Sequence, residues 1–291
     1  MDSFEEFLSE HHDTYLNVIT PGGNHGDTLI HMGLMKKLEE YGIEYTCFNL
    51  EEIYNQNLWL GVKYLVNIGL WKIGSNQGFK LFDLPSETEL ILFEGGGYMS
   101  DIWYGPTLLK QIIKQCNAPV AICPQSYLFT RTRFEEYFKD KRPVYLFCRE
   151  KYSFELLSEM NLPNNVYVSV SPELAFYLTR DDLTEFVESR TGDYDLVSFR
   201  DDRESAINQD MKKKVIRESN NPLVADISMK RTLKDFVSTV YNANHIYTDR
   251  LHVAILSKIL GKQATLYGNK YHKNKGVWEY SLYDSIEFVE V

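Results

Sequence analysis

The sequence predicts an α/β fold made of two Rossmann-like domains that face a cleft, and three observations support this prediction. Short apolar runs alternate with helical segments, a pattern typical of parallel sheets with helices on both faces. A polar segment, residues 179–192, divides the alternation into two halves. Glycine or polar residues follow most of the apolar runs, and α/β sheets bind ligands at that edge. We expect an N-terminal domain over residues 1–178 and a C-terminal domain over 193–291, joined by the polar linker.

The N-terminal half opens as a βαβ unit. After an acidic lead-in over residues 1–15, the apolar run 16–20 predicts a strand. Apolar residues at helical spacing predict a helix over 28–41, which Gly42 ends, and 43–50 is the next strand. Two strands joined through a helix in this way lie parallel in one sheet.

The later elements continue the alternation. An aromatic region over residues 51–84 is expected to be helical in part. Apolar runs predict further strands in the two halves, at 90–93, 119–123, 144–148, 166–170, 195–199, 223–227, 245–247 and 263–267. Helical segments are predicted between them, at 107–115, 134–140, 151–157, 209–217, 232–242 and 250–260.

Composition and charge exclude several classes of protein. A net charge of −10 argues against a general binder of nucleic acid or of acidic membranes, since either needs a basic surface, but a local pair of arginines can still bind an anionic small molecule. The sequence has no run of about 20 apolar residues, which a membrane span needs. Its acidic N-terminus lacks the features of a signal peptide. The four cysteines lie in apolar contexts without a C-x-x-C pair, as reduced core cysteines do. We therefore expect a cytoplasmic protein, and the sequence does not indicate its oligomeric state.

The strongest candidate for a site follows the predicted strand 245–247. Thr248 or Asp249 can cap the helix that comes next. Arg250 and His252 then occupy its first turn, where free backbone N–H groups and the helix dipole favour an anion. A guanidinium and an imidazole there make a phosphate or carboxylate site with a proton donor beside it. A surface arginine and a packed histidine would give the same pattern.

Two glycine-containing loops also follow predicted strands. Residues 22–27 open a helix, so their glycines let the backbone approach a ligand closely. They match neither the G-x-G-x-x-G dinucleotide pattern nor a P-loop, which disfavours NAD and ATP. Asp27 is either a helix cap or a catalytic group. Gly95–Gly97 is either a tight turn or a floor under a substrate.

Charged side chains follow other strands. Arg149 either pairs with an acid such as Glu150 or faces the cleft, and Arg200 has the same two interpretations. Asp201 and Asp202, flanked by arginines, are interpreted as a solvated turn. No residues have convincing metal-ligand spacing, and the G-x-S-x-G elbow of serine hydrolases is missing. We expect no metal and no cofactor.

Together these motifs resemble the polysaccharide pyruvyl transferase family, and the resemblance covers residues 16–280. The matching motifs occur in the family's order, at Gly23–Ile30, Gly95–Gly97, Pro124–Ser126, Arg149–Glu150 with Ser153, and Asp249–His252. Residues 269–275 also resemble the family's C-terminal lysine-bearing segment. The chain departs from the family at Ser171-Pro172, where Asp-Pro is frequent, and it leaves little room for acceptor-binding insertions.

The resemblance implies a GT-B-like fold with phosphoenolpyruvate as the donor substrate. The pyruvyl group would be transferred as a ketal to a sugar of a cell-surface or extracellular polysaccharide, or of its precursor, with release of phosphate. A sugar or glycan is thus an expected partner. A lipid-linked glycan at the membrane surface, and with it membrane association, is left open, because no basic amphipathic helix is evident in the sequence.

The resemblance also implies roles for individual residues. Arg250 and the helix amides beside it would hold the phosphate, and Arg149 would contact the donor from the first domain. His252 is the first candidate for proton transfer, and Asp27 is the second, as a base for the acceptor hydroxyl. The expected substrate-binding residues are Asn24, Gly26, Gly95, Gly96, Gly97, Gln125, Ser126, Leu251 and Lys270.

Two other functions fit the same pattern. A GT-B-type glycosyltransferase would bind the diphosphate of a nucleotide sugar at the same helix start. A non-catalytic glycan- or anion-binding protein would keep the fold without activity. Such a binder has no evident need for Asn24, Asp27, Arg149, Arg250 and His252 together.

Overall fold

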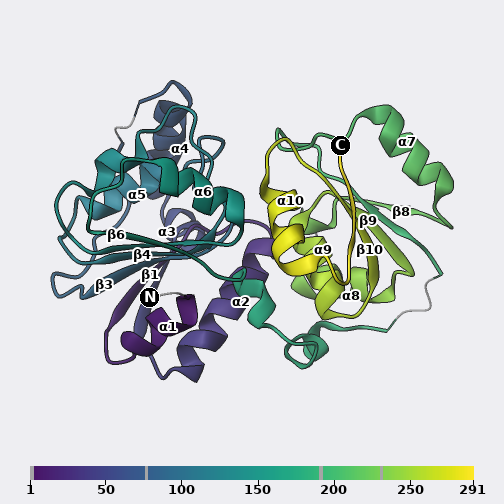
Figure 1. The fold of residues 1–291 in the computed structure, drawn as a ribbon, viewed down its shortest axis with the longest axis horizontal. Helices are drawn as coiled ribbons and strands as arrows, with labels where there is room; N and C mark the ends of the chain where they lie inside the picture. The colour runs from purple at the N-terminus through teal and green to yellow at the C-terminus, as the bar shows by residue number, and fades with distance from the viewer. Residues whose placement is uncertain (1–2, 76–77, 190–192, 230–231) are drawn as a thin grey trace. The chain divides into compact units, whose positions relative to one another are not determined.

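The protein forms two α/β units, each with its own parallel sheet and its own hydrophobic core (Figure 1). The computed structural model describes residues 3–75, 78–189, 193–229 and 232–291. Unit 1 comprises residues 1–22 and 34–173, and unit 2 comprises residues 23–33 and 174–291.

Unit 1 contains a sheet of six parallel strands in the order β2-β1-β3-β4-β5-β6. The strands are β1 (Leu16–Thr20), β2 (Tyr45–Asn49), β3 (Leu90–Phe93), β4 (Val120–Gln125), β5 (Val144–Cys148) and β6 (Val166–Val170). The central strands β1, β3 and β4 are buried along their whole length. This explains why they are rich in apolar residues in the sequence.

In unit 1, helix α1 precedes the first strand, and helices and a 3₁₀ turn connect the strands that follow. These elements are α1 (Phe4–Glu10), α2 (His25–Glu40), α3 (Leu50–Gln56), α4 (Leu58–Lys72), α5 (Gly105–Ile113), α6 (Lys151–Glu159) and the 3₁₀ turn Phe134–Phe138. The aromatic region 51–84 thus begins with two helices, capped by the side chains of Asn49 and Asn57. Only the later part of α2, from Leu34, belongs to this unit.

Unit 2 contains a sheet of five parallel strands in the order β11-β10-β9-β7-β8. The strands are β7 (Leu196–Ser198), β8 (Leu223–Val224), β9 (His245–Thr248), β10 (Gln263–Tyr267) and β11 (Glu287–Val289). The helices are α7 (Gln209–Glu218), α8 (Leu233–Asn242), α9 (Leu251–Ile259) and α10 (Lys273–Val277), with 3₁₀ turns at Leu174–Tyr177, Asp181–Phe186 and Ile227–Met229 and a π-helical turn at Trp278–Leu282.

The two sheets share one strand order. Numbered within its own unit, each sheet reads 2-1-3-4-5, and the sheet of unit 1 adds a sixth strand. In this doubly wound order the chain reverses direction between the first and third strands, and ligands bind beyond the carboxyl ends of those two strands. The corresponding pairs are β1 with β3 and β7 with β9. The predicted α/β fold with two parallel sheets is confirmed.

Several predicted boundaries differ from the structure. Helix α2 begins at His25, three residues earlier than predicted, because Asn24 and Asp27 cap it. The strand predicted over 223–227 ends at Val224, and Asp226 Oδ1 accepts the N–H of Ser228 at 3.3 Å in a local turn.

The expected linker is structured where the structure describes it. Leu183, within residues 179–192, is fully buried in the core of unit 2, while residues 190–192 lie outside the described residues. Residues at the start of α2 pack on the same core, among them Leu29. The expected domain boundaries and the cleft remain predictions. No helix of the described residues is long and apolar enough to cross a membrane.

Candidate functional site

Arg250 lies at the carboxyl end of β9, on one side of the switch point of unit 2. Its backbone N–H donates to Thr248 Oγ1 at 2.9 Å, and the Thr248 hydroxyl donates to the carbonyl of Ser198 at 2.7 Å. Thr248 therefore links the ends of β9 and β7, the two strands that flank the switch point. Arg250 is itself the N-cap residue of α9, and no side chain caps this helix. The prediction that Thr248 or Asp249 caps α9 is thus wrong.

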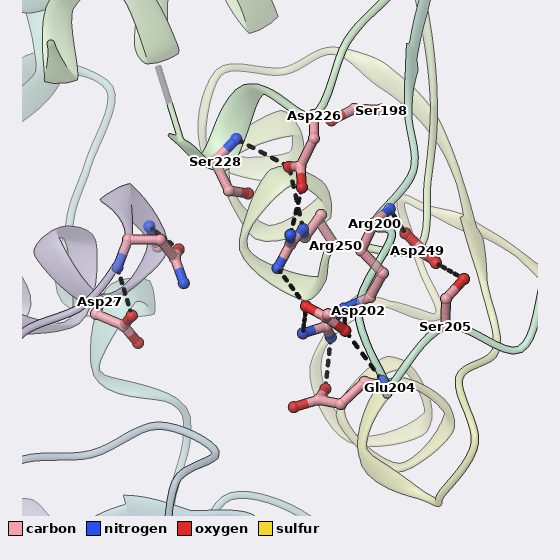
Figure 2. Close-up of polar contacts among 12 residues, drawn as sticks. Asp27, Ser198, Arg200, Asp202, Glu204, Ser205, Asp226, Ser228, Asp249 and Arg250 are labelled. Carbon is pink, nitrogen blue, oxygen red and sulfur yellow. Dashed lines mark hydrogen bonds and ion pairs between the residues drawn. The ribbon is translucent and has the colours of Figure 1, made fainter. Parts of the chain in front are cut away.

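Two carboxylates hold the guanidinium of Arg250 (Figure 2). Its Nε donates to Asp226 Oδ1 at 3.1 Å and its Nη2 donates to Oδ2 of the same carboxylate, a bidentate pair. Asp202 Oδ2 lies 3.5 Å from Arg250 Nη1. The side chain of Arg250 is 13% exposed, and those of Asp226 and Asp202 are 27% and 33% exposed. Solvent therefore reaches this arginine and both of its partners.

Asp202 also contacts a second arginine, Arg200, which follows β7. Arg200 Nη2 donates to Asp202 Oδ2 at 2.8 Å, and Nη1 donates to the buried carboxylate of Glu204. Glu204 in turn accepts a hydrogen bond from Lys273 Nζ. Burial raises the pKa of Asp202, but the Arg200 hydrogen bond, the backbone N–H of Glu204 and the arginine charges lower it by more, so the net shift is downward. Asp202 lies in a turn and is 33% exposed, as the interpretation of a solvated turn expects, but its carboxylate also pairs with two arginines, which that interpretation missed.

These ion pairs form one cluster, which we call the arginine cluster. It alternates three cations with three carboxylates, in the order Asp226, Arg250, Asp202, Arg200, Glu204 and Lys273. The three positive and three negative formal charges of the cluster cancel. An anion at this site therefore meets less repulsion than the net charge of the chain, −10, would suggest. An anion that binds Arg250 would compete with Asp202 and Asp226 for the guanidinium.

Asp249 holds the backbone of the arginine cluster in place through hydrogen bonds. Its carboxylate is buried and accepts the backbone N–H of Arg200 at 2.8 Å and the hydroxyl of Ser205 at 2.9 Å. Burial raises its pKa, and these two hydrogen bonds offset only part of that effect. The buried Asn274 donates its side-chain amide to the Asp249 carbonyl at 2.9 Å. Asp249 thus fixes the loop after β7 against the start of α9.

Asn24 and Asp27 form a reciprocal cap at the start of α2. Asn24 Oδ1 accepts the N–H of Gly26 at 2.8 Å, and Asp27 Oδ2 accepts the N–H of Asn24 at 2.9 Å. Gly23 has a φ of 147°, and a Cβ there would lie 2.1 Å from Asp27 Oδ2. The structure therefore gives Asp27 a capping role, and Figure 2 shows it apart from the arginine cluster. Its expected role as a base remains a prediction.

Gly26 and His252 lie against each other within unit 2. A Cβ at Gly26 would lie 2.4 Å from His252 Nδ1 and 2.7 Å from His252 Cβ. Only glycine leaves room for the half-buried imidazole at this position. The family motif around Gly26 therefore packs directly on the motif that carries Arg250 and His252, although the two are far apart in the sequence.

Arg149 in unit 1 is buried and pairs with a buried carboxylate. Its side chain is 1% exposed; Nη1 donates to the buried carboxylate of Glu173, and Nε donates to Ser126 Oγ at 2.9 Å. Its partner is thus Glu173, whereas Glu150 caps α6 by accepting the N–H of Ser153 at 2.9 Å. Contact of Arg149 with the donor remains a prediction.

The loop Gly95–Gly97 follows β3 and lies at the carboxyl edge of the sheet of unit 1, as Arg149 does after β5. Gly96 donates its N–H to the Pro124 carbonyl at 3.2 Å and accepts the N–H of Ser126 at 3.1 Å. Gln125 is buried, and its side-chain amide donates to the Glu94 carbonyl at 2.8 Å. Gly96 has a φ of 129°, which other residues rarely adopt. Gly95 is buried as well, and Gly97 is half-buried. These residues hold the ends of β3 and β4 together.

The remaining predicted residues have different surroundings. Leu251 is buried in the core of unit 2. Lys270 is exposed, and its backbone N–H donates to the Glu204 carbonyl at 3.1 Å. Within the lysine-bearing segment it is Lys273 whose side chain reaches the arginine cluster. In unit 1, Ser171 accepts the N–H of Phe4 at 2.6 Å and so anchors the start of α1.

Sequence reasoning missed several members of the arginine cluster, namely Asp202, Glu204, Asp226 and Lys273. The spacing of Glu204 four residues after Arg200 was a local signal for the ion pair. Asp226 and Lys273 gave no such signal, because their partners lie 24 and 69 residues away in the sequence. Within the described residues no group of three or more His, Cys, Asp or Glu side chains is arranged to hold a metal ion.

Comparison with protein families identifies the chain. The model of the polysaccharide pyruvyl transferase family matches residues 24–271, and the chain belongs to this family. The matched segment contains the capping pair Asn24 and Asp27, the Arg149 contacts and the start of α9 with Arg250. A comparison with curated proteins finds no match.

Two solved structures are similar to this chain. One is a functionally uncharacterised protein from Klebsiella pneumoniae, with 23% sequence identity and a TM-score of 0.66, over 99% of this chain and 97% of that chain. The other is a UDP-N-acetylglucosamine 2-epimerase, with 11% identity and a TM-score of 0.49, over 95% of this chain and 83% of that chain. The first similarity establishes the fold over nearly the whole chain.

Proposed function

We propose that the protein transfers the pyruvyl group of phosphoenolpyruvate to two hydroxyls of one sugar in a polysaccharide or its precursor. Family membership supports the reaction class. The observation that carries the choice of site is the position of Arg250. It occupies the N-cap position of α9 beyond the carboxyl end of β9, at the switch point of unit 2, and its side chain is 13% exposed.

The reaction requires charge neutralisation and proton transfer. Protonation of the methylene carbon of phosphoenolpyruvate gives the methyl group and leaves the adjacent carbon open to attack. One sugar hydroxyl adds to that carbon, the carbon–oxygen bond to phosphate breaks, and the second hydroxyl adds to close the ketal. Of the two hydroxyl protons lost, one balances the proton taken up by the methyl carbon and the other leaves with phosphate.

The residues of unit 2 supply the required groups. Arg250 and the first N–H groups of α9 bind the phosphate, since a guanidinium fork and a helix N-terminus both favour a phosphate dianion. His252, two residues further along, is the proton donor to the methylene carbon. Gly26 packs against its imidazole and so sets the position of the ring. Asp27 remains the second choice, as the base for the acceptor hydroxyl.

Ligand-induced thermal stabilisation tests the donor. Phosphoenolpyruvate at about 100 times its dissociation constant should stabilise the native protein by about 2.7 kcal/mol. We expect that shift in the wild type and in Arg133→Ala, a matched variant whose arginine is exposed on unit 1. The shift should disappear in Arg250→Ala. Comparing each variant with and without ligand removes any intrinsic loss of stability.

The alternatives predict different results. Stabilisation by a nucleoside diphosphate, and none by phosphoenolpyruvate, would favour a nucleotide-sugar glycosyltransferase. An equal shift in Arg250→Ala would place the donor elsewhere. For catalysis, phosphate release from phosphoenolpyruvate is measured with a panel of glycan acceptors. His252→Ala should retain the thermal shift and lose phosphate release, and unchanged release would exclude His252 as the proton donor.

A further inference from the structure

Helix α4 exposes an unusual number of large apolar side chains. Leu58 is 86% exposed, Trp59 73%, Leu65 68% and Ile73, at the C-cap, 79%. Val62 and Val66 lie among them and are exposed too. Figure 1 shows α4 at the periphery of unit 1. An apolar surface of this extent on a polar molecule marks an interaction site.

These side chains occupy one face of the helix. Their spacing of three, four and seven residues, from Trp59 through Val62 and Val66 to Ile73, follows the helical repeat. We call this face the α4 stripe, and it consists of Leu58, Trp59, Val62, Leu65, Val66 and Ile73. The opposite face holds α4 on unit 1, where Tyr64, Ile68 and Trp71 pack on the core. Because that face already anchors the helix, the fold of unit 1 does not need the α4 stripe.

The charges carried by α4 itself are all positive, although Glu51 of the neighbouring helix α3 lies close to Tyr64 of α4. The charged residues of α4 are Lys63 and Lys72, and the helix has no acidic residue, although the chain carries a net charge of −10. At 3.6 residues per turn, the two lysines flank the apolar stripe on opposite sides. Lysines in this position can keep their ammonium groups in water beside anionic headgroups while the apolar side chains enter the acyl boundary.

We propose that α4 docks the protein on the surface of an anionic lipid bilayer. The positive charges of the two flanking lysines attract acidic headgroups. Tryptophan, the residue at position 59, is enriched at membrane–water interfaces. With 15 residues, α4 is about 22 Å long, shorter than the hydrocarbon core of about 30 Å. The helix therefore lies in the plane of the interface and does not span it.

The position of α4 in the fold links docking to the ligand edge of the N-terminal sheet. Helix α3 begins directly after β2, and a Cβ at Gly22, in the loop after β1, would lie 2.8 Å from Glu51 Cβ in α3. Tyr54 of α3 and Tyr64 of α4 stack with their ring centroids 4.4 Å apart. The docking helix is thus held on the edge of unit 1 where the strands β1 and β2 end. Docking is independent of the reaction proposed above and is tested without substrate.

Vesicle flotation tests the proposal. The wild type should float with vesicles of phosphatidylcholine and phosphatidylglycerol and much less with phosphatidylcholine alone. Leu65→Ser should lower the partition coefficient about tenfold, because one large apolar side chain no longer enters the bilayer. Lys63→Gln and Lys72→Gln should each lower it about fivefold, and only on the anionic vesicles. Tyr167→Ser, a matched change at an exposed aromatic residue of β6, should have no effect.

Three outcomes would overturn the proposal. The first is that the wild type does not float with anionic vesicles. The second is that Leu65→Ser floats as well as the wild type. Alternatively, light scattering would show a dimer that Leu65→Ser dissociates, which would assign the α4 stripe to a second copy of the chain. Circular dichroism of Leu65→Ser should match the wild type, because the side chain is mostly exposed, so a loss of flotation is not a loss of folding.

Discussion

Replacing Arg149 by methionine is expected to destabilise the protein by about 3–5 kcal/mol. The arginine is 1% exposed and its partner Glu173 is fully buried, so the substitution leaves a carboxylate without its cation in the interior. The Ser126 hydroxyl loses the Arg149 Nε donor at the same time. The change in volume is small, so the cost comes from the charge and not from a cavity.

A second substitution tests the cause of the loss. In the double variant Arg149→Met with Glu173→Leu both charges are gone, and apolar replacements of a buried pair are often neutral or stabilising. The double variant should therefore recover most of the stability that the single variant loses. Arg133→Met is the matched control: Arg133 is exposed and lies 3.4 Å from Glu136, and its loss should cost less than about 1 kcal/mol.

Denaturant midpoints measured by far-UV circular dichroism compare these variants. A single variant within about 1 kcal/mol of the wild type would refute the reasoning, because a broken buried pair costs more. So would a double variant no more stable than the single one. The double variant also tests the donor contact expected from the sequence. If Arg149 binds phosphoenolpyruvate, this variant is stable but shows no ligand-induced shift.

Three further predictions concern local contacts. Gly26→Ala should displace His252 and cost about 1–3 kcal/mol of stability, and differential scanning calorimetry that showed no loss would contradict the contact. Asn24→Ala removes the cap of α2 and should cost about 1 kcal/mol by the same measurement, while a neutral effect would exclude the capping role. Asp101 accepts three backbone N–H groups from residues 130–132; burial raises its pKa, but the Thr132 hydroxyl and these N–H groups lower it by more. Because the pKa of Asp101 is lower in the folded than in the unfolded protein, its ionised carboxylate stabilises the fold at any pH above the unfolded value of about 3.9. This contribution disappears as the pH falls through the folded pKa. Asp101→Asn should therefore cost about 1–2 kcal/mol at pH 7 and progressively less below about pH 4. A pH-independent difference in unfolding midpoints would contradict that origin.

The central strands were predictable because they are buried on both faces. The runs at β1, β3 and β4 are mostly apolar because both faces of these strands are buried, so each of them appears in the sequence as a short apolar segment. The ligand edge followed from the polar residues after each run. Arg250 and His252 were placed at a helix start for this reason, and the structure has them there.

The partners of Arg250 were not predictable from local patterns. Asp226 reaches it only because β8 and β9 both border β7, a consequence of strand order that the sequence does not display. The same applies to Lys273 and Glu204, which are brought together by the fold of unit 2. Ion pairs of this kind depend on topology, whereas caps such as Asn24 with Gly26 depend on neighbours in the chain.

The apolar face of α4 escaped prediction for a different physical reason. The α4 stripe and the opposite, packed face are both apolar. The sequence around Trp59 and Tyr64 therefore has no clear polar face that would show which side of the helix is exposed to solvent. A helix that is apolar all round is ordinarily buried. Burial in the structure is what separates the exposed Leu65 from the packed Ile68.

The two arginines expected to bind the donor differ in how their carboxylate partners can respond to an anion. An anion at Arg149 would displace Glu173, which is fully buried, and a buried carboxylate without its cation is costly. An anion at Arg250 would displace Asp226 or Asp202, whose side chains are 27% and 33% exposed and can turn into water. Arg250 can therefore exchange a carboxylate for a phosphate at little cost in desolvation. This asymmetry supports the proposal that unit 2 binds the anion. If Arg149 has only a supporting role, the double variant at Arg149 and Glu173 should keep the ligand-induced shift.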